Sequence, residues 1–596
     1  METMGNLRRT HYSVALSEAN VGEEVTVAGY VAKVRDLGAV VFCDVRDTKG
    51  VVQLNFGDDC AAETLEKAKM LRTEFVVMAK GEVVLREKAN PNIPTGKIEI
   101  KVGELKILSK AETTPFEIKD DINVKDELKL KYRYLDLRRS KMHDGLIVRH
   151  KVVRAVREYF DRNDFIEIET PVLMKSTPEG ARDYVVPSRV QPGKFFALPQ
   201  SPQIYKQLLM LSGYDRYVQI ARCFRDEDLR ADRQPEFTQI DVEMAYVDEV
   251  DIQTMNEGFI KKAFKEVLDV DVPTPFPRMT YQKAMDDYGS DKPDTRFDMK
   301  LCDVSDCVAN TEFAVFRNAL DNGGSVRCIV AKGLADKLTR KEIDKLVEVV
   351  KTYGAKGLAY TRITADAETS SFEKFLTAEQ IAAVREKAQA EKGDVILVVA
   401  SDDMDVVYAS LGALRLHIAK KFELFDPEQF NFLWVTNFPL FEYDKEEERF
   451  VAKHHPFTMP KDDDIDIVET NPGACRAKAY DMVLNGVELG GGSIRITNPE
   501  LQHKMFKTLG FTEERISENF GFLVEAYKYG APPHGGMAYG LDRLCMLMAH
   551  KDSIRDVIAF PKVQNSGEIM SGCPDYIEPK QMNELYIAST VEATEE

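Results

Sequence analysis

The sequence predicts a multidomain protein of mixed α+β class. Its 596 residues suggest roughly three or four domains by length alone. Residues 14–110 are rich in β-branched strand-like segments, whereas helical and strand-like stretches alternate after residue 141. Hydrophobic residues make up 44% of the chain and charged residues 30%, which provides enough apolar material for several cores.

The charge and cysteine content narrow the class of protein. The net charge of −19 disfavours a nucleic-acid partner, but residues 1–110 hold 16 Lys/Arg and 16 Asp/Glu and are neutral. No apolar run approaches the ~18–20 residues of a membrane span, and the N-terminus lacks a stretch of signal-peptide length. Nine cysteines are scattered without any C-x-x-C pair, so we expect nine reduced thiols in a cytoplasmic protein with no membrane association.

The first predicted domain is a small β-barrel. Five strand-like segments lie between about residues 14 and 110, and one helical stretch at about residues 58–72 interrupts them. Five strands with one late helix are typical of an OB-type barrel, a frequent binder of single-stranded nucleic acid. A general β-barrel is the alternative. A charged segment that is poor in strand signals, residues 113–140, predicts a linker.

The remaining chain predicts one domain interrupted by another. Residues 141–288 begin with a helical pattern and continue with strand-like segments. Residues 289–418 mix helices and strands and predict a self-contained α+β insertion. The earlier character resumes over residues 419–565, and residues 566–596 predict a loose C-terminal extension.

A charged stretch joins two predicted strands at residues 224–241, FRDEDLRADRQPEFTQID. It holds three arginines and six acidic residues, which a solvated salt-bridge loop would also explain. On its second strand Phe237, Gln239, Asp241 and Glu243 share one face, and the opposite face is apolar. A polar row on a central strand suggests a platform for a ligand, although a half-exposed antiparallel strand is the ordinary alternative.

A predicted hairpin brings two carboxylates together. Asn485-Gly486 lies between alternating residues and predicts a two-residue turn. Counting back from the turn places Asp481 and Glu488 as diagonal neighbours on one face. Two carboxylates at this spacing repel unless a cation lies between them, and hard oxygen ligands suit Mg²⁺. A solvated acidic pair is the alternative.

Two further features point to anions. Gly540 precedes an apolar helix whose first turn contains Arg543, where the helix dipole favours an anion; a surface arginine is the alternative. The adjacent His454 and His455 would point in opposite directions on a strand, so anion contacts are favoured over a shared metal, with a plain loop pair as the alternative. The sequence contains no phosphate-binding P-loop and no dinucleotide fingerprint.

These motifs together resemble those of the class II aminoacyl-tRNA synthetases. Residues 224–243 resemble motif 2, GLDRLCM at residues 540–546 resembles motif 3, and FIEIETPVL at residues 165–173 resembles motif 1, the dimer-forming strand. TPEGARDY, QSPQIYKQLL, HHPF and ELGGGSIRI are similar to the aspartyl-tRNA synthetase family, and the large insertion is similar to its bacterial type. The resemblance runs over nearly the whole chain.

The resemblance implies an architecture and an activity. The implied parts are an OB-fold anticodon-binding domain (1–112), a hinge (113–140), an antiparallel-sheet catalytic domain (141–288 with motifs 1 and 2, and 419–565 with motif 3), an insertion domain (289–418) and a C-terminal extension (566–596). The implied activity is ATP-dependent activation of L-aspartate to aspartyl-adenylate, then transfer to the 3′ end of tRNA(Asp), by a homodimer.

The resemblance also implies roles for individual residues. Catalysis is implied for Arg225, Glu488 and Arg543. ATP is expected at Arg225, Asp226, Glu227, Gln234, Glu488, Gly540, Leu541, Asp542 and Arg543. Aspartate is expected at Glu179, Gln203, Lys206, Arg225, Asp241, His454 and Arg495. Mg²⁺ is expected at Asp481 and Glu488, and the anticodon at Arg35, Phe42, Gln53 and Glu99, with barrel core as the alternative for Phe42.

Three other functions are compatible with parts of the pattern. An asparaginyl enzyme shares the arginine contact with phosphate, but Lys206 and the large insertion favour aspartate. A non-catalytic RNA-binding paralogue would be expected to lack catalytic residues, and all of them are present. Some relatives charge both tRNA(Asp) and tRNA(Asn); Leu37 resembles the restricted versions, because the relaxed ones often carry histidine there.

Overall fold

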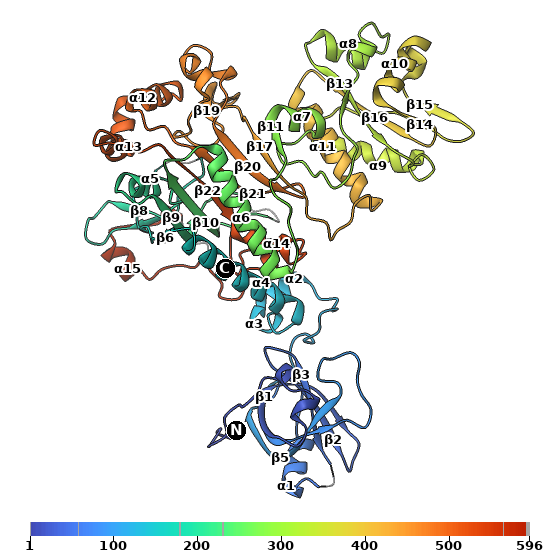
Figure 1. The fold of residues 1–596 in the computed structure, drawn as a ribbon, viewed down its shortest axis with the longest axis vertical. Helices are drawn as coiled ribbons and strands as arrows, with labels where there is room; N and C mark the ends of the chain where they lie inside the picture. Colours follow the sequence, from blue (N-terminus) through green and yellow to red (C-terminus); the bar gives the residue numbers. More distant parts are fainter. Residues whose placement is uncertain (1, 58, 178–179, 229–231, 564, 592–596) are drawn as a thin grey trace. The chain divides into compact units, whose positions relative to one another are not determined.

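The computed structural model describes residues 2–57, 59–177, 180–228, 232–563 and 565–591. The chain forms two compact units, Met1–Lys141 and Met142–Glu596 (Figure 1). The first unit contains a closed barrel, and the second contains an eight-stranded sheet, a five-stranded sheet and two small two-stranded sheets. Among the described residues, no helix is both long enough and apolar enough to cross a membrane.

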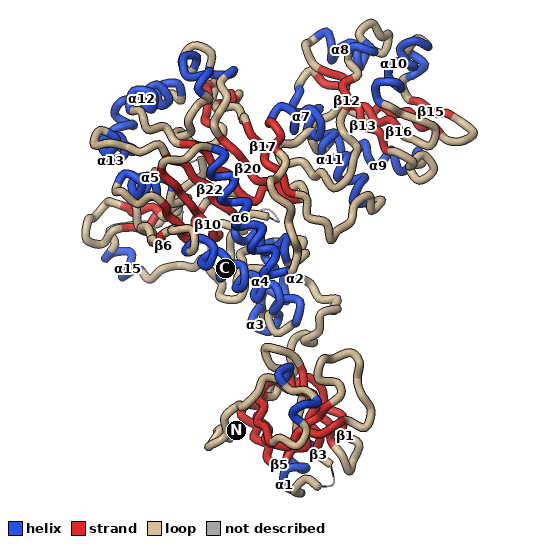
Figure 2. The backbone as a smooth tube through the Cα atoms, viewed as in Figure 1, coloured by secondary structure: helices blue, strands red, loops and turns tan. Residues whose placement is uncertain are grey.

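The first unit is built on a closed barrel of five strands in the order β1-β2-β3-β5-β4 (Figure 2). Alternating residues of β2, among them Val41, Cys43 and Val45, fill its core. Parallel pairing of β3 with β5 closes the otherwise antiparallel barrel. The elements are β1 (Glu24–Asp36), β2 (Val41–Arg46), β3 (Val51–Phe56), α1 (Ala62–Lys69), β4 (Val76–Leu85) and β5 (Ile98–Ser109). The predicted OB-type barrel with one inserted helix is confirmed.

The segment after the barrel contains two short helices, α2 (Asp126–Lys131) and α3 (Arg133–Asp136). The Asp136 carboxylate accepts hydrogen bonds from Arg133 at 2.6 Å and from Arg139 at 2.7 Å, and all three side chains are buried. Buried charges are tolerated when they are paired in this way, so the ion-pair cluster orders this part of the predicted linker.

The second unit is organised by an eight-stranded sheet in the order β11-β17-β20-β21-β22-β10-β9-β6. Its six central strands pair antiparallel, whereas the outermost pairs, β11 with β17 and β6 with β9, are parallel. The strands are β6 (Ile166–Glu167), β9 (Arg216–Phe224), β10 (Glu236–Ala245), β11 (Arg278–Thr280), β17 (Phe432–Thr436), β20 (Ala479–Leu484), β21 (Val487–Ile494) and β22 (His534–Gly540). The predicted antiparallel sheet is therefore present, but β6, in the predicted motif 1 strand, is only two residues long.

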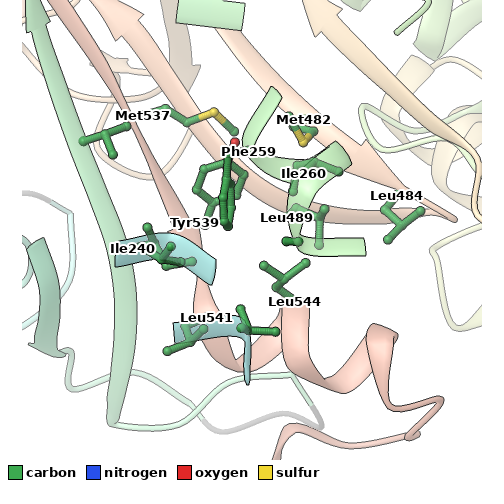
Figure 3. Packing of buried hydrophobic residues seen from close by; sticks show 14 of the residues in the cluster. Ile240, Phe259, Ile260, Met482, Leu484, Leu489, Met537, Tyr539, Leu541 and Leu544 are labelled. Atoms are coloured by element: carbon green, nitrogen blue, oxygen red, sulfur yellow. The ribbon is translucent and has the colours of Figure 1, made fainter. Parts of the chain in front are cut away.

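Three helices cover one face of this sheet: α4 (Ser140–Asp161), α6 (Glu249–Leu268) and α14 (Leu541–Met548). Figure 3 shows Ile240 of β10 and Met482 of β20 among the residues that pack against Phe259 of α6 and Leu544 of α14. The apolar residues predicted for one face of β10 thus lie in the core, which turns the polar row of that strand toward the opposite face.

The opposite face is bordered by α5 (Gln203–Leu211), α12 (Pro499–Thr508) and α13 (Glu513–Tyr527). These three helices pack together through one cluster, in which Ile204 of α5 lies with Phe506 of α12 and Phe520 of α13. Phe457 belongs to the same cluster. The second unit also contains two small two-stranded sheets: β7 (Val185–Pro187) with β8 (Phe195–Ala197), and β18 (Phe441–Asp444) with β19 (Arg449–Ala452). The C-terminal segment contains α15 (Pro579–Glu584).

The predicted insertion is a separate α+β layer structure, which follows α7 (Tyr281–Tyr288). Its five-stranded sheet has the order β12-β13-β16-β14-β15. Helices α8 and α10 pack on one face and α9 and α11 on the other. The elements are β12 (Cys302–Asp303), α8 (Ala314–Asp321), β13 (Ser325–Ala331), α9 (Arg340–Lys351), β14 (Ala359–Ile363), β15 (Glu368–Ser370), α10 (Ala378–Ala388), β16 (Val395–Ser401) and α11 (Met404–Lys421).

Candidate active site

A cavity of about 510 Å³ lies on the polar face of the eight-stranded sheet. Polar side chains of β10, α5, α14 and the β20–β21 hairpin line it. The sequence-predicted residues among its lining are Gln203, Lys206, Arg225, Glu227, Gln234, Asp241, His454, Asp481, Glu488, Arg495, Gly540, Asp542 and Arg543. Residues more than 300 positions apart in the chain therefore meet at one place.

Two of the described residues that were predicted for this site, Asp226 and Leu541, are not part of its lining. The predicted Glu179 lies outside the described residues. Asp226 faces Arg182 at 3.3 Å between Oδ2 and Nε. Leu541 is 1% exposed and packs into the core beside Leu544 (Figure 3), because the first residue of α14 faces the covered side of the sheet.

Four charged residues of the cavity form a compact cluster, which we call the inner quartet: Lys206, Asp241, Glu243 and Arg495. The Nζ of Lys206 lies 2.6 Å from Oδ1 of Asp241 and 3.4 Å from Oε2 of Glu243. Arg495 donates from Nε and NH2 to the two oxygens of Glu243 at 2.8 and 2.9 Å. The four side chains are 0–3% exposed, so two cations and two anions are enclosed together with no net charge.

The polar alternation of β10 explains how this cluster forms. Asp241 and Glu243 point to the same side of the strand, and α5 brings Lys206 over them. Arg495 directly follows β21, which is separated from β10 only by β22. The sequence placed Glu243 on the polar row but assigned it no role, since the order of these strands is not apparent from the sequence.

The two carboxylates of the inner quartet differ in their acidity. Burial raises the pKa of Asp241, and the neighbouring Lys206 only partly offsets this. Burial alone would also raise the pKa of Glu243, but Arg495 and Lys206 outweigh it and lower that pKa to about 2. Glu243 is therefore the firmly ionised member of the cluster, whereas Asp241 also keeps its Oδ2 without a hydrogen-bond partner among the described residues.

His455, the neighbour of the predicted His454, supports the inner quartet. Arg495 NH1 lies 2.7 Å from Nε2 of His455 and donates to Oγ of Ser493 at 2.6 Å. Burial and the positive Arg495 hold the pKa of His455 well below its usual range, so the ring is neutral and Nε2 accepts. His454 lines the cavity instead, with its Nε2 3.7 Å from Oδ1 of Asp481.

The second group of charges, the outer quartet, consists of Arg225, Asp481, Glu488 and Arg543. The predicted hairpin turn is present, with φ of 52° at Asn485 and 83° at Gly486. Leu484 pairs with Val487 and Val483 with Glu488 as counted from the sequence, but a bulge then shifts Asp481 opposite Gly491. This bulge could not be read from the alternation alone.

The two carboxylates of the hairpin converge above Gly491. A Cβ atom at Gly491 would lie 2.4 Å from Oδ1 of Asp481 and 3.9 Å from Oε1 of Glu488. Burial and the charge of Asp481 raise the pKa of Glu488. The Oδ1 of Asp481 is buried and has no hydrogen-bond partner among the described residues.

These two carboxylates fit a divalent cation that takes its other ligands from elsewhere. The described residues contain no group of three or more His, Cys, Asp or Glu that could enclose a metal ion. Mg²⁺ commonly binds through one or two carboxylates and completes its shell with water and substrate phosphates. The pair therefore suits Mg²⁺ together with a phosphate ligand better than a site built only from protein.

The two arginines of the outer quartet, Arg225 and Arg543, both line the cavity. The Arg225 guanidinium lies over the Phe237 ring, 5.1 Å from its centroid, and its buried Nε has no hydrogen-bond partner in the described part of the chain. Arg543, in the first turn of α14, donates to the Glu488 carbonyl at 3.2 Å and to Asp232 at 3.1 Å. Two guanidinium groups beside two carboxylates form a surface that can take phosphate and metal together.

Several predicted nucleotide contacts are occupied by protein partners. The Gln234 amide is paired with the backbone of Lys562, accepting at 2.7 Å and donating at 3.2 Å. Asp542 accepts from the Thr238 N–H at 3.0 Å and from Arg149, which joins α14 to β10 and α4. Glu227 lies 3.3 Å from Arg233. These side chains line the cavity and also brace its walls.

The barrel carries a second polar cluster, which brings together all four residues predicted there. Arg35 donates to Gln53 at 2.6 Å, and Gln53 donates to Glu99 at 2.5 Å. Phe42 is only half-buried and lies next to Arg35, so it faces outward rather than into the barrel core. Sequence reasoning missed Asn55, which bonds to Glu99 at 2.6 Å, and Arg86, which bonds to Gln53 at 2.8 Å. Asn55 lies two residues from Gln53 on β3, so the strand period could have found it.

Comparison with protein families covers most of the chain. Residues 125–564 match the family described as "tRNA synthetases class II (D, K and N)", and residues 25–108 match "OB-fold nucleic acid binding domain". The chain is 60% identical over 590 residues to the "Aspartate--tRNA ligase" of Ruminiclostridium cellulolyticum, covering 98% of this chain and 99% of that protein. It is 57% identical over 588 residues to the "Aspartate--tRNA(Asp/Asn) ligase" of Caldanaerobacter subterraneus, with the same coverage.

Solved structures share the fold at low sequence identity. The asparaginyl-tRNA synthetase from Pyrococcus horikoshii complexed with asparaginyl-adenylate has a TM-score of 0.57 at 20% identity, covering 91% of this chain and 95% of that one. The aspartyl tRNA synthetase from Entamoeba histolytica has a TM-score of 0.57 at 19% identity, covering 94% and 92%. At this identity the likeness concerns the fold alone.

Proposed function

This chain belongs to the class II tRNA synthetases of the aspartate, lysine and asparagine group, and we propose that it is an aspartate–tRNA ligase that activates aspartate with ATP and transfers it to tRNA. The observation that carries the choice of amino acid is the inner quartet. Its two buried cations, Lys206 and Arg495, suit a ligand that brings a carboxylate. A lysine side chain would instead compete with Lys206 and Arg495 for Asp241 and Glu243.

The outer quartet suits the activation step. In that step a carboxylate oxygen of aspartate bonds to the α-phosphorus of ATP while the bond from that phosphorus to pyrophosphate breaks. Arg225 and Arg543 would stabilise the negative charge on the transferring group. Asp481 and Glu488 would hold Mg²⁺, which neutralises phosphate charge when it is bound. No protein nucleophile is required, so catalysis rests on positioning and charge stabilisation.

The transfer step moves the aspartyl group to a terminal ribose hydroxyl of tRNA. The hydroxyl oxygen bonds to the carbonyl carbon of the adenylate, and AMP leaves. Asp241, with its unpartnered Oδ2, and Gln203, with a buried Nε2 that also lacks a partner among the described residues, lie in the cavity and suit the polar backbone end of aspartate.

Discrimination against asparagine follows from the charge of the inner quartet. A substrate carboxylate gives Lys206 and Arg495 an additional anionic acceptor, whereas an amide places an N–H group against one of them. Sites built on buried polar partners reject such misfits by roughly 10⁴-fold or more. The firmly ionised Glu243 keeps both cations in place in either case.

The barrel cluster suits the anticodon. Phe42 is exposed enough to stack on a base, an interaction worth roughly 1–3 kcal/mol. Gln53 and Glu99 offer amide and carboxylate groups to base edges, and Arg35 and Arg86 each keep a buried nitrogen without a partner among the described residues. Substitution of Phe42 by alanine should weaken tRNA binding while leaving aspartate activation unchanged.

We further propose that the protein is a homodimer and that it works in a reducing compartment. Ile166 is 50% exposed, Val172 47% and Leu173 52%, so the segment that resembles motif 1 presents apolar side chains that a second copy would cover. All nine cysteines are free, which fits a cytoplasmic location. Light scattering should give twice the chain mass.

A second candidate function is relaxed specificity toward tRNA. One of the relatives described above bears a name that includes both tRNA(Asp) and tRNA(Asn). Leu37 is 72% exposed and is the first residue after β1, in the β1–β2 loop of the barrel, where a base could contact it. Charging of purified tRNA(Asn) and tRNA(Asp) transcripts with aspartate, side by side, distinguishes the restricted enzyme from the relaxed one.

The proposed amino-acid specificity is tested by ATP–pyrophosphate exchange. Aspartate should support exchange, and asparagine and lysine should not. Exchange with asparagine in place of aspartate would reject the proposal.

A further inference from the structure

The insertion is joined to the cavity by a short connection whose contacts extend in both directions. We call residues 289–301 the root segment, because they lead from α7 into β12. Asp291 of this segment lines the active-site cavity. The root segment is thus both the start of the insertion domain and a part of the active-site wall.

On the insertion side, the root segment is held by a buried arginine. Arg415 of α11 is 1% exposed and donates to the carbonyls of Asp294 at 3.0 Å and Met299 at 3.2 Å. Its guanidinium also lies 4.3 Å from the ring centroid of Phe297. One side chain of the insertion domain therefore fixes the path of the root segment over several residues.

Close packing adds to this attachment. Gly289 begins the root segment with φ of +66°, and a Cβ atom there would lie 2.3 Å from the carbonyl oxygen of Tyr408 and 3.1 Å from the amide of Gly412, both in α11. The Tyr408 hydroxyl donates to Asp286 of α7 at 2.7 Å. Helix α11 and the start of the root segment are in direct backbone contact.

On the other side, the root segment touches the turn of the carboxylate hairpin. A Cβ atom at Gly486 would lie 3.1 Å from Cβ of Asp294. The Thr295 carbonyl accepts from the Asn431 side chain at 3.1 Å, and the Asn431 N–H donates to the Asn485 side chain at 2.9 Å. The turn at residues 485–486 therefore rests on the root segment.

From these contacts we propose that the insertion domain positions the metal-binding carboxylates Asp481 and Glu488, acting through Arg415, the root segment and the 485–486 turn. Arg415 and Gly486 are positioning residues in this account, because neither touches a substrate. The inference rests on the proposed function for the metal ligands, and it gives the insertion domain a role in nucleotide binding. Partners of metal-bound ligands commonly change metal affinity by roughly 10–100-fold when they are altered.

The first test compares two glycines with the same backbone requirement. Gly486 has φ of +83° and faces Asp294, whereas Gly510 has φ of +76°, and a Cβ atom there would meet no other atom within 4 Å. Mn²⁺ binding is measured by electron paramagnetic resonance in the presence of a non-hydrolysable ATP analogue. Gly486→Ala should weaken Mn²⁺ binding about 10-fold, and Gly510→Ala should leave it unchanged.

The second test acts from the insertion side. Arg415→Lys keeps the charge but cannot bridge the same carbonyls, and it should weaken Mn²⁺ binding several-fold. Arg385, which pairs with Glu368 and Glu373 elsewhere in the insertion domain, supplies the control Arg385→Lys, which should bind Mn²⁺ normally. If Arg415→Lys fails to fold, as shown by thermal unfolding, Gly486→Ala still decides the question.

A kinetic readout separates positioning from general damage. Both test variants should raise the KM for ATP in pyrophosphate exchange while the dissociation constant for aspartate stays the same, since the ion pairs of the inner quartet are formed without the root segment. Equal Mn²⁺ affinity for Gly486→Ala and Gly510→Ala would overturn the inference. Asp481→Asn identifies the level of failure: if it also leaves Mn²⁺ binding unchanged, the proposed metal site itself is wrong.

Discussion

At the inner end of the cavity Lys206, Arg495, Asp241 and Glu243 compensate one another, whereas at the outer end two carboxylates share a site and Arg225 has no ion pair among the described residues. The contrast is visible in the acidities. Opposite charges lower the pKa of Glu243 to about 2, and burial with a like charge raises that of Glu488. The charges of the inner end are balanced without a ligand. The outer end gains its charge compensation from a ligand.

Under the proposed function, the difference between the two ends separates the recognition of aspartate from that of ATP. A rigid arrangement of paired charges favours selection of one small side chain, because few positions can adjust to a misfit. Unpaired charges around a phosphate and metal site favour binding that strengthens as charge develops during the reaction. Each end therefore has a different response to mutation and pH.

The largest expected effect comes from breaking the inner quartet. Glu243→Gln should reduce the free energy of unfolding by about 3–5 kcal/mol, because it leaves Arg495 and Lys206 buried without their common partner. Urea unfolding can be followed by the fluorescence of the single tryptophan, Trp434. Trp434 is 0% exposed in the eight-stranded sheet, so its fluorescence reports the unfolding of this sheet.

Two comparisons sharpen this prediction. Asp241→Asn should reduce the free energy of unfolding by less than Glu243→Gln does, because Lys206 still has Glu243 as an ion-pair partner at 3.4 Å. The difference between wild type and Glu243→Gln should be fully present above the ordinary glutamate pKa of 4.5 and shrink as pH falls toward about 2, since protonation removes the stabilisation of a group with a lowered pKa. A difference that grows with acidity would contradict the assignment.

At the outer end, Arg225→Ala should impair chemistry with little effect on folding. The rate of ATP–pyrophosphate exchange should fall by roughly 10²–10³-fold, the usual loss when one donor to a developing charge is removed. Arg222→Ala is the matched control, because Arg222 lies on the other face of β9 and pairs with Glu236 at 2.7 Å. Arg225→Ala with wild-type exchange would contradict the mechanism.

At the outer end, pH should act on Mg²⁺ binding, because the pKa of Glu488 is raised whereas that of Glu243 is lowered. Metal binding requires ionised carboxylates, and the raised pKa of Glu488 means that a proton competes with the metal. The Mg²⁺ concentration for half-maximal exchange should rise as pH falls toward that raised pKa, by at most about tenfold per pH unit. Glu488→Gln should need more Mg²⁺ at every pH and lose this dependence.

The smallest effect should come from Ser493→Ala. This change removes one of the hydrogen bonds to Arg495, of length 2.6 Å, and leaves both bonds to Glu243. A loss of about 1 kcal/mol in the free energy of unfolding is expected. A loss as large as that of Glu243→Gln would show that the quartet depends on its surroundings more than on its ion pairs.

Local patterns in the sequence predicted the elements that depend on neighbours along the chain. The alternation on β10 and the turn at Asn485-Gly486 were both correct, and so was the barrel; the predicted insertion has a five-stranded sheet of its own. These features follow from strand period, turn chemistry and composition.

The contacts that depend on strand order were not predictable. Glu243 meets Arg495 because β22 places β10 and β21 two strands apart in the sheet, and no local pattern shows this order. The bulge beyond Val483, the role of His455 and the attachment of the root segment to the hairpin have the same origin. A local pattern can also predict too much: the strand-like sequence around β6 forms a strand of only two residues.

Calorimetric titration tests the contrast between the two ends most directly. Aspartate is titrated into the protein without ATP, with and without Mg²⁺, and ATP is then titrated under the same two conditions. The account predicts that aspartate binds equally well in both cases and that ATP binds much more tightly with Mg²⁺. Aspartate binding that requires Mg²⁺ or ATP would contradict the claim that the ion pairs of the inner quartet are formed before the nucleotide arrives.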